Sequence, residues 1–248
     1  MLVIPPVLHY HGTMEQMIEL WPGGLKYTGD AVGTDSLALA AFAGGGKARR
    51  GCDLGCGSGI LLLLLAQENP RLMMDGVELR PSAAEDCRRN ILANGFDGRC
   101  RVWTGDLRET ALPPGSMDLA VCNPPYFAPG TGAVPRDAER AVMRTESASL
   151  PELCAAAARL LRRGGEFCLV HRSERLAEVF AALTAAGLEP RRLRFIALAP
   201  GRAPGLFLCA ARKGARPGLK VEPPLIQCGA DGAETAEYRR ICHMEAEA

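Results

Sequence analysis

Two short polar motifs follow apolar runs and carry side chains that could bind a ligand and act on it. The first is Asp53-Leu-Gly55-Cys-Gly57-Ser-Gly59, which lies between a predicted strand and a predicted helix. Glycines permit a sharp turn and a close approach of ligand to backbone, and a helix N-terminus presents free amides. Glu78 ends the next apolar run, 19 residues after Gly59. A carboxylate at that place can accept hydrogen bonds from ribose hydroxyls, so the pattern predicts a nucleoside-binding turn.

The glycine spacing indicates which kind of nucleoside ligand fits. A dinucleotide-binding turn would need a glycine at position 60, where this chain has Ile60. Asp53 would also repel a pyrophosphate. A ligand that joins a nucleoside to a cationic or amino-acid tail fits better. The alternative is a glycine-rich turn without a ligand.

The second motif is Asn123-Pro124-Pro125-Tyr126, directly after another apolar run. Two prolines stiffen the turn and remove two amide donors, so the local carbonyl groups can face a ligand. Asn123 offers an acceptor oxygen and a donor nitrogen, and Tyr126 offers a flat face for a planar group. Open α/β sheets bind ligands at the carboxyl ends of their strands, where both motifs would lie. The alternative is a proline-rich loop without a chemical role.

The elements that must position these motifs begin near residue 50. Short apolar runs alternate there with helical patterns, which is typical of a largely parallel α/β sheet. Helices are predicted over Ile60–Glu68, from Pro81 to Gly95, and after a Ser149/Glu152 capping box. Seven strands are predicted, the last two as an antiparallel hairpin at one sheet edge: Cys52–Leu54, Leu72–Glu78, Arg101–Thr104, Met117–Cys122, Glu166–Val170, Arg192–Leu198 and Leu206–Ala211.

The chain reads as a single domain. We expect an N-terminal extension over residues 1–48 that packs on the core, a core over residues 49–228, and a C-terminal tail over residues 229–248. The tail is acidic and weakly patterned, so we expect it to add nothing to substrate binding.

Composition and cysteine placement restrict the function classes. Hydrophobic residues make up 48% of the chain and charged residues 23%, which excludes a disordered or fibrous protein. The longest apolar run, Ile60–Ala66, is too short to span a bilayer, and no basic stretch precedes an apolar N-terminal region, so a cytoplasmic protein is expected. Ten cysteines without a Cys-x-x-Cys pair, beside only four histidines, predict free thiols and no metal site.

The net charge of +1 hides an uneven distribution. Residues 1–135 carry a net charge of −3, residues 136–220 carry +8, and residues 221–248 carry −4. The middle block indicates either a phosphate-facing surface or a solvated face in an arginine-rich protein.

The motifs resemble those of a known enzyme class. Asp53-x-Gly55-x-Gly57-x-Gly59 resembles the cofactor motif of class I S-adenosylmethionine-dependent methyltransferases, and Asn123-Pro124-Pro125-Tyr126 resembles that of their amino-group-methylating branch. Further stretches resemble the bacterial tRNA (adenine-N6) methyltransferase group that modifies a valine tRNA: Thr34–Leu37, Phe127, Arg140–Glu146, Gly164–Gly165, Val170–Leu176 and Lys220–Pro224. The resemblance implies a Rossmann-like α/β fold with a mostly parallel seven-stranded sheet and an antiparallel edge hairpin. It also implies S-adenosylmethionine as cofactor and tRNA as partner.

The resemblance implies roles for individual cofactor-binding residues. Glu78 would hold the cofactor ribose, and Asp106 would accept a hydrogen bond from the cofactor adenine. The glycine loop with Asp53 would contact the methionine portion. Asp35 could reach the cofactor's amino group, although a structural role beside a helix cap suits it equally well.

On the substrate side, the Asn123 side-chain oxygen and the Pro124 carbonyl would each accept one hydrogen from a substrate amino group. Tyr126 would stack on the extruded base. The candidate RNA contacts are Pro125, Phe127, Arg136, Arg140, Arg144, His171 and Arg172. The segment from Arg136 to Arg144 could close over the substrate or form a solvated loop with ordinary salt bridges, and His171 could be a satisfied strand-end histidine.

Two other functions remain open at this point. The same chemistry could act on a protein glutamine or on another RNA base, although the chain has no long helical segment before Thr34 of the kind expected in the release-factor enzymes. A degenerate fold kept as a binding protein is the non-enzymatic alternative, and the two intact motifs disfavour it.

Overall fold

The computed structural model describes residues 17–20, 24–44, 46–124 and 148–242. Its strands are β1 (Ile18–Leu20), β2 (Leu25–Tyr27), β3 (Arg50–Leu54), β4 (Met73–Glu78), β5 (Cys100–Thr104), β6 (Met117–Cys122), β7 (Leu161–Arg172), β8 (Leu188–Ala197), β9 (Leu206–Lys213) and β10 (Lys220–Ile226). Its helices are α1 (Thr34–Ala43), α2 (Ile60–Glu68), α3 (Pro81–Ala93), α5 (Leu150–Leu160), α6 (Leu176–Ala185) and α7 (Ala236–Ile241), with a 3₁₀ turn at Ser173–Arg175.

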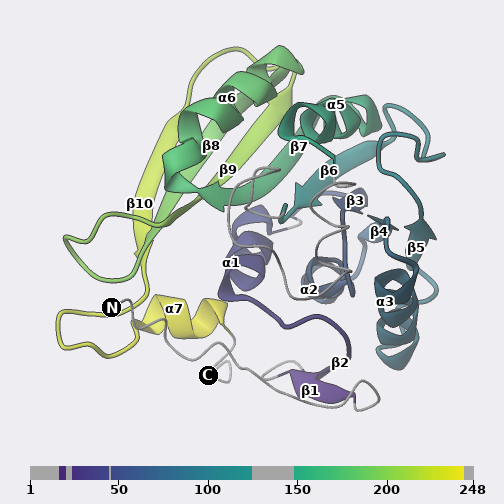
Figure 1. The fold of residues 1–248 in the computed structure, drawn as a ribbon, viewed down its shortest axis with the longest axis horizontal. Helices are drawn as coiled ribbons and strands as arrows, with labels where there is room; N and C mark the ends of the chain where they lie inside the picture. The colour runs from purple at the N-terminus through teal and green to yellow at the C-terminus, as the bar shows by residue number, and fades with distance from the viewer. Residues whose placement is uncertain (1–16, 21–23, 45, 125–147, 243–248) are drawn as a thin grey trace, which may run out of the picture.

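An eight-stranded sheet forms the centre of the molecule, in the order β10-β8-β9-β7-β6-β3-β4-β5 (Figure 1). Strands β7, β6, β3, β4 and β5 are mutually parallel, whereas β9 runs antiparallel to both β7 and β8. The α/β fold with a mostly parallel sheet and an antiparallel hairpin is confirmed.

The predicted strand count of seven is wrong, because β10 pairs in parallel with the outer side of β8 and takes the edge position from the hairpin. Its register shifts between Glu222 and Leu225, where Pro223 and Pro224 lie. Prolines cannot donate to a strand ladder, so this segment lacks the continuous pattern that predicts a strand.

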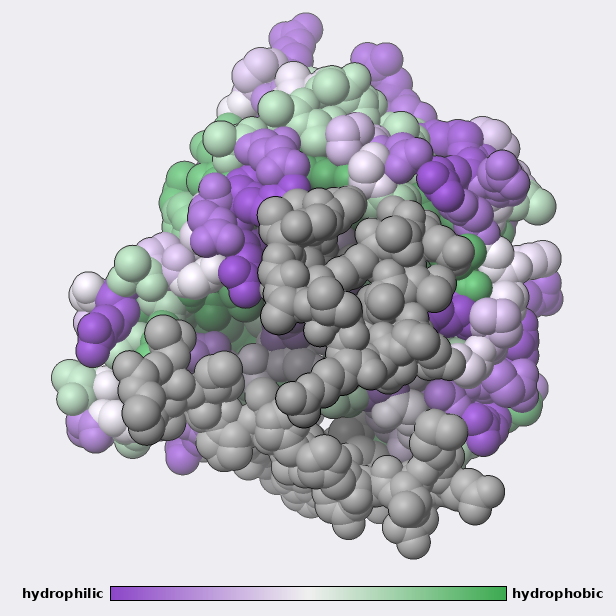
Figure 2. Space-filling view, in the orientation of Figure 1, coloured by the Kyte–Doolittle hydropathy of each residue, from purple (hydrophilic) through white to green (hydrophobic). Residues whose placement is uncertain are grey.

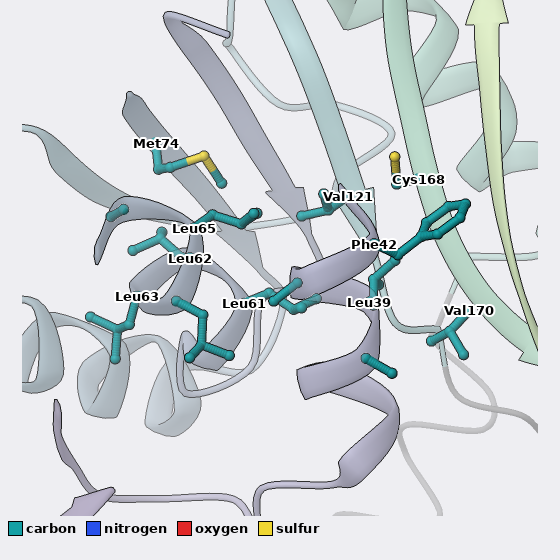
Figure 3. Packing of buried hydrophobic residues seen from close by; sticks show 14 of the residues in the cluster. Leu39, Phe42, Leu61, Leu62, Leu63, Leu65, Met74, Val121, Cys168 and Val170 are labelled. Atoms are coloured by element: carbon teal, nitrogen blue, oxygen red, sulfur yellow. The ribbon is translucent and has the colours of Figure 1, made fainter. Parts of the chain in front are cut away.

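Two hydrophobic layers hold helices against the sheet. Helices α1, α2 and α3 cover one face, and α5 and α6 cover the other (Figure 1). On the first face, Leu39 and Phe42 of α1 gather with Cys168 and Val170 of β7 and with the leucines of α2 (Figure 3). This packing fixes the N-terminal end of α1 close to the ends of the central strands.

Several elements differ from their predicted extent. Helix α2 has its predicted bounds, but β7 begins five residues earlier than predicted, because Arg162-Arg163-Gly164-Gly165 lacks apolar alternation. Strands β1 and β2 and helix α7 are too short to leave a periodic pattern. The C-terminal segment therefore carries more structure than its sequence indicates, and Tyr238 of α7 is buried in the core.

All ten cysteines are free, and all but Cys228 are buried. Burial raises the pKa of Cys100 to about 11 and that of Cys154 to about 12, so these thiols stay protonated at neutral pH. They act as small core side chains.

None of the described helices combines the length and apolar character needed for a bilayer span. On the face shown in Figure 2, hydrophilic and hydrophobic residues are interspersed over the described surface.

Candidate active site

The sheet brings the glycine loop and the described start of the second motif, Asn123 and Pro124, together at the carboxyl ends of its strands. The chain leaves β3 toward β4 and β5 on one side, then returns to β6 and β7 on the other side of β3. Asp53 of β3 pairs with Val121 of β6, so two positions further on Gly55 is level with Asn123. This reversal of strand order is the place where open α/β sheets bind ligands.

The glycine loop leaves open space beside its backbone. Gly55, Gly57 and Gly59 all have positive φ angles, of 75°, 54° and 90°. A Cβ atom at Gly59 would lie 2.5 Å from the Sγ atom of Cys87, so this glycine lets α3 approach α2. A Cβ atom at Gly55 would meet no atom of the described residues within 4 Å. The loop therefore has room for a ligand at Gly55 and is closely packed at Gly59.

Glu78 joins the end of β4 to the glycine loop. Its carboxylate accepts hydrogen bonds from the Gly57 amide at 2.7 Å, the Arg80 amide at 2.9 Å and the Arg80 Nε atom at 3.3 Å. An ionised carboxylate can accept about four hydrogen bonds, so Glu78 keeps capacity for a ligand hydroxyl.

Asp30 and Arg80 form a part of the site that the sequence did not reveal. Their ion pair has an N–O distance of 2.6 Å, and the same Arg80 side chain contacts Glu78. A Cβ atom at Gly57 would lie 3.3 Å from Asp30 Oδ2 and 3.7 Å from the Arg80 guanidinium. The pair therefore closes one side of the loop at Gly57. The two residues are 50 positions apart, and no sequence pattern links them.

Asn90 of α3 ties this loop to the segment before α1. Its side chain is fully buried, accepts from the Thr28 amide and donates to the carbonyl groups of Thr28 and Ser58, each at 2.9 Å. The Ser58 hydroxyl in turn accepts from the Asp30 amide at 3.0 Å. An asparagine inside a helical pattern gives no sequence signal for this role.

Asp53 is a buried carboxylate without an ordinary hydrogen-bond partner. It is 1% exposed, and within the described part of the chain neither of its carboxylate oxygens makes a hydrogen bond of ordinary geometry, although the Leu62 amide lies near it. Burial and the neighbouring Glu78 raise the pKa of Asp53 to about 8, and the Leu62 amide opposes this rise. Buried polar groups are normally satisfied, so an unpartnered carboxyl group next to the glycine loop suits a cationic ligand.

Asp106 follows β5 at the same edge of the sheet. The preceding Gly105 amide donates to the Glu78 carbonyl at 2.8 Å. The Asp106 carboxylate is already held by Arg108, whose hydrogen bonds lower the pKa of Asp106. Arg108 also contacts Glu152 at 3.1 Å. A ligand amine at Asp106 would therefore compete with Arg108.

Asn123 follows β6 and is half-buried. Its Nδ2 atom donates to the Ser36 hydroxyl of α1 at 2.9 Å. The neighbouring Asp35 accepts from the Ser36 amide at 2.8 Å. Asp35, Asn123 and Pro124 thus lie at one corner. The remaining substrate-side candidates lie outside the described residues: Pro125, Tyr126, Phe127, Arg136, Arg140 and Arg144.

His171 lies near the carboxyl end of β7 and is 2% exposed. Its Nδ1 atom accepts from the Arg172 amide at 2.8 Å, and its ring stacks on Phe207. Burial first, and then nearby Arg175, lower the pKa of His171 to about 4. This neutral, enclosed ring is suited to a structural role and not to direct contact with RNA phosphate. Arg172, in contrast, is exposed and contacts Glu174 at 3.4 Å.

The positive block of the sequence divides between two ends of the sheet. Arg172 and Arg175 follow the carboxyl end of β7, on the side of Asn123. Arg162 and Arg163 begin β7, and Lys213 ends the antiparallel β9, which puts all three at the opposite edge. The described part of the block therefore does not form one surface beside the two motifs.

Together, the described residues fit a ligand that combines a ribose with positive charge. Glu78 keeps acceptor capacity, the described residues leave space beside Gly55, and Asp53 supplies a buried carboxyl group whose ionised form would favour a cation. Asn123 lies at the next strand end and binds Ser36 through its Nδ2 atom. The arrangement can hold a nucleoside cofactor beside an amine acceptor. Within the described residues no group of histidine, cysteine or acidic side chains could hold a metal ion.

Comparison with known proteins relates this site to methyl transfer. The sequence model of the methyltransferase small domain matches residues 31–185. A tRNA1(Val) (adenine(37)-N6)-methyltransferase of Yersinia pestis (strain Pestoides F) is 39% identical over 142 residues, as is that of Yersinia enterocolitica serotype O:8 / biotype 1B. The match covers 56% of this chain and 56% of each relative. The chain thus spans about half the length of the curated relatives it matches.

Solved structures agree on the fold. A predicted O-methyltransferase from Agrobacterium tumefaciens has a TM-score of 0.70 at 23% identity, and the match covers 86% of this chain and 98% of that one. Geranyl diphosphate C-methyltransferase from Streptomyces coelicolor A3(2), in complex with Mg2+, geranyl diphosphate and S-adenosyl-L-homocysteine, has a TM-score of 0.53 at 16% identity, covering 71% of this chain and 77% of that one. These two neighbours are named for oxygen and carbon as acceptors, so the shared fold leaves the acceptor atom open. Because the family model covers more than half of the sequence, the chain belongs to the methyltransferase small domain family.

Proposed function

We propose that this protein is an S-adenosylmethionine-dependent N-methyltransferase that methylates the exocyclic N6 amino group of an adenine in tRNA. The observation that carries the proposal is the register of β3 and β6, which sets Asn123 level with the glycine loop. The 39% identity to tRNA1(Val) (adenine(37)-N6)-methyltransferases supports adenine in tRNA as the acceptor. An RNA substrate of this kind implies that the protein works in the cytoplasm.

S-adenosylmethionine supplies an electrophilic methyl group on a positively charged sulfur. In this proposal Glu78 accepts hydrogen bonds from the ribose hydroxyls, and Asp106 accepts one from the adenine amino group in competition with Arg108. The glycine loop contacts the methionine portion, with Asp35 near its amino group. A cationic cofactor favours the ionised form of Asp53 behind the loop, so its binding lowers the pKa of this carboxyl.

On the acceptor side, the Asn123 Oδ1 atom and the Pro124 carbonyl each accept one hydrogen of the substrate amino group. This draws the nitrogen lone pair out of conjugation with the ring and directs it toward the methyl group. The transfer is then a single in-line displacement whose rate depends chiefly on positioning. A strong base is not needed, because the proton leaves to water after the transfer. Tyr126 stacks on the extruded base, and Phe127 with the arginines from Arg136 to Arg144 contacts RNA.

A label-transfer assay tests this proposal. The protein is incubated with methyl-labelled S-adenosylmethionine and one acceptor at a time. The acceptors are unmodified bacterial tRNA, ribosomal RNA and a protein extract. We expect label in the tRNA, recovered as N6-methyladenosine after digestion. Asn123→Ala should lower the rate at least about 100-fold, since it removes an acceptor that positions the amine. Its affinity for S-adenosylhomocysteine, measured by calorimetry, should stay within about threefold because the cofactor contacts remain.

The matched control is Asn94→Ala, at the far end of α3, whose amide bonds the Lys26 backbone. We expect it to keep the parent rate. Label in ribosomal RNA or in protein glutamine, with none in tRNA, would show that the substrate is not tRNA. If the protein had no affinity for S-adenosylhomocysteine, the result would favour the non-enzymatic alternative, a binding protein with a degenerate methyltransferase fold.

A further inference from the structure

The side-chain amide of Asn123 has two different ends, and only one suits the proposed chemistry. Its oxygen accepts a hydrogen bond, whereas its nitrogen donates two. A substrate amino group presents hydrogens, so it needs the oxygen. With the amide turned over, the nitrogen would face the substrate with its own hydrogens. Something must therefore select between two orientations that occupy nearly the same volume.

Ser36 contacts the nitrogen end of this amide. The Asn123 Nδ2 atom donates to the Ser36 hydroxyl oxygen at 2.9 Å, which leaves the Oδ1 atom on the other side of the amide. Ser36 is 6% exposed, so bulk water does not readily replace it as the partner of Nδ2.

The backbone around Ser36 is held from two directions. Its amide donates to the Gly33 carbonyl at 3.1 Å and to Asp35 Oδ1 at 2.8 Å, in the first turn of α1. One turn later, Leu39 is fully buried, and Phe42 packs beside Cys168 of β7 (Figure 3). Since β7 pairs with β6, the strand that ends before Asn123, the hydroxyl and the amide are anchored to adjoining strands. The hydrogen bond therefore joins two rigid parts of the fold.

We infer that Ser36 is the positioning residue for Asn123: its hydroxyl accepts from Nδ2 and so holds Oδ1 toward the substrate amino group. This inference rests on the proposed N-methyltransferase function. Ser36 does not touch the reacting atoms and acts through Asn123. It contributes to the rate of methyl transfer without contributing to cofactor affinity.

Ser36→Ala and Ser36→Thr test the inference in the label-transfer assay. Ser36→Ala should lower kcat about tenfold, which corresponds to the loss of one neutral hydrogen bond. Ser36→Thr, which keeps the hydroxyl, should recover at least about a third of the parent kcat, because the same acceptor faces Nδ2. The affinity for S-adenosylhomocysteine should change less than about twofold in both variants. Ser116→Ala, at the amino end of β6, is the matched control and should keep the parent kcat.

A second readout does not depend on activity. The side-chain NH2 resonances of Asn123, identified by their loss in Asn123→Ala, should exchange with solvent faster in Ser36→Ala than in the parent or in Ser36→Thr. Unchanged exchange in Ser36→Ala would overturn the inference. So would a kcat within about twofold of the parent, or a loss of kcat accompanied by equal loss of cofactor affinity. A parent protein that transfers no methyl group would refute the proposed function, while the exchange measurement would still test the hydrogen bond.

Discussion

Polar side chains make different contacts at the two ends of the parallel strands, which we call the amino edge and the carboxyl edge of the sheet. At the amino edge, Asp118 accepts from the backbone amides of Arg49 and Arg50, at 2.8 and 3.1 Å, and pairs with Arg162. Lys213 donates to the Leu161 carbonyl at 2.7 Å in the same region. These groups bind one another and the backbone, so they stabilise the strand ends.

At the carboxyl edge, the polar groups keep unused capacity. Asp53 has no ordinary hydrogen-bond partner within the described residues, Glu78 can accept further bonds, and Asn123 uses Nδ2 for Ser36. Unsatisfied buried groups cost stability and are therefore rare outside binding sites. We interpret the carboxyl ends of the strands as the ligand-binding side of the sheet and the amino ends as the side that stabilises the fold. Substitutions at the two edges should accordingly affect different properties.

The largest effect is expected for Glu78→Ala. Removing the carboxylate should weaken S-adenosylhomocysteine binding about 100-fold, because a charged acceptor for the ribose hydroxyls is lost. Isothermal titration calorimetry measures this change. The matched control, Asp75→Ala, removes a carboxylate from the same strand that accepts from Trp103 Nε1 instead. Equal affinities of Glu78→Ala and the control would remove Glu78 from the cofactor site.

Asp53→Asn should affect both binding and the pH dependence of stability. The raised pKa of Asp53, about 8, means that the folded protein binds a proton that the unfolded chain releases near pH 4. The stability that the folded protein gains from this bound proton is full below the pKa of Asp53 in the unfolded chain. It is lost as pH rises toward 8, at no more than about 1.4 kcal/mol per pH unit. Asp53→Asn should therefore gain stability relative to the parent between pH 5 and pH 8, as followed by chemical denaturation.

The same variant should bind S-adenosylmethionine about tenfold more weakly than the parent at pH 8, because the ionised carboxylate that favours a cation is gone. At pH 6 the difference should shrink, since Asp53 is then largely protonated in the free parent. A pH-independent difference in stability and in affinity would contradict the account of Asp53.

Asp118→Ala should give the smallest and most restricted effect. Partial burial of Asp118 raises its pKa, but the hydrogen bonds from Arg162 and from the amides of Arg49 and Arg50 outweigh this effect and lower the pKa. Their loss should cost about 1–2 kcal/mol of unfolding free energy at pH 7. Because the folded pKa is lowered, the difference should disappear as pH falls through that value. Cofactor affinity and kcat should not change. A fall in either would contradict the expectation that the amino edge affects stability alone.

The location of the site could be predicted from sequence because it follows from strand direction. Parallel strands end at one edge, so a glycine turn after β3 and Asn123 after β6 had to be neighbours once the sheet formed. Helix α2 was equally predictable, because its apolar run is bounded by Gly59 and Asn69.

The links between these parts could not be predicted. The Asn123–Ser36 hydrogen bond joins residues 87 positions apart, and the Arg80–Asp30 pair joins residues 50 apart. Such contacts depend on how α1 and the segment before it pack, and neither serine nor aspartate has a sequence pattern for that. Strand β10 was missed because two prolines interrupt it and its pairing with β8 supplies the stability.

A crystal structure with S-adenosylhomocysteine would show directly where the cofactor binds. We expect the ribose hydroxyls within hydrogen-bond distance of the Glu78 carboxylate, and the sulfur on the side of the glycine loop that faces Asn123. A ligand bound at another edge of the sheet, or one whose ribose leaves Glu78 untouched, would contradict it.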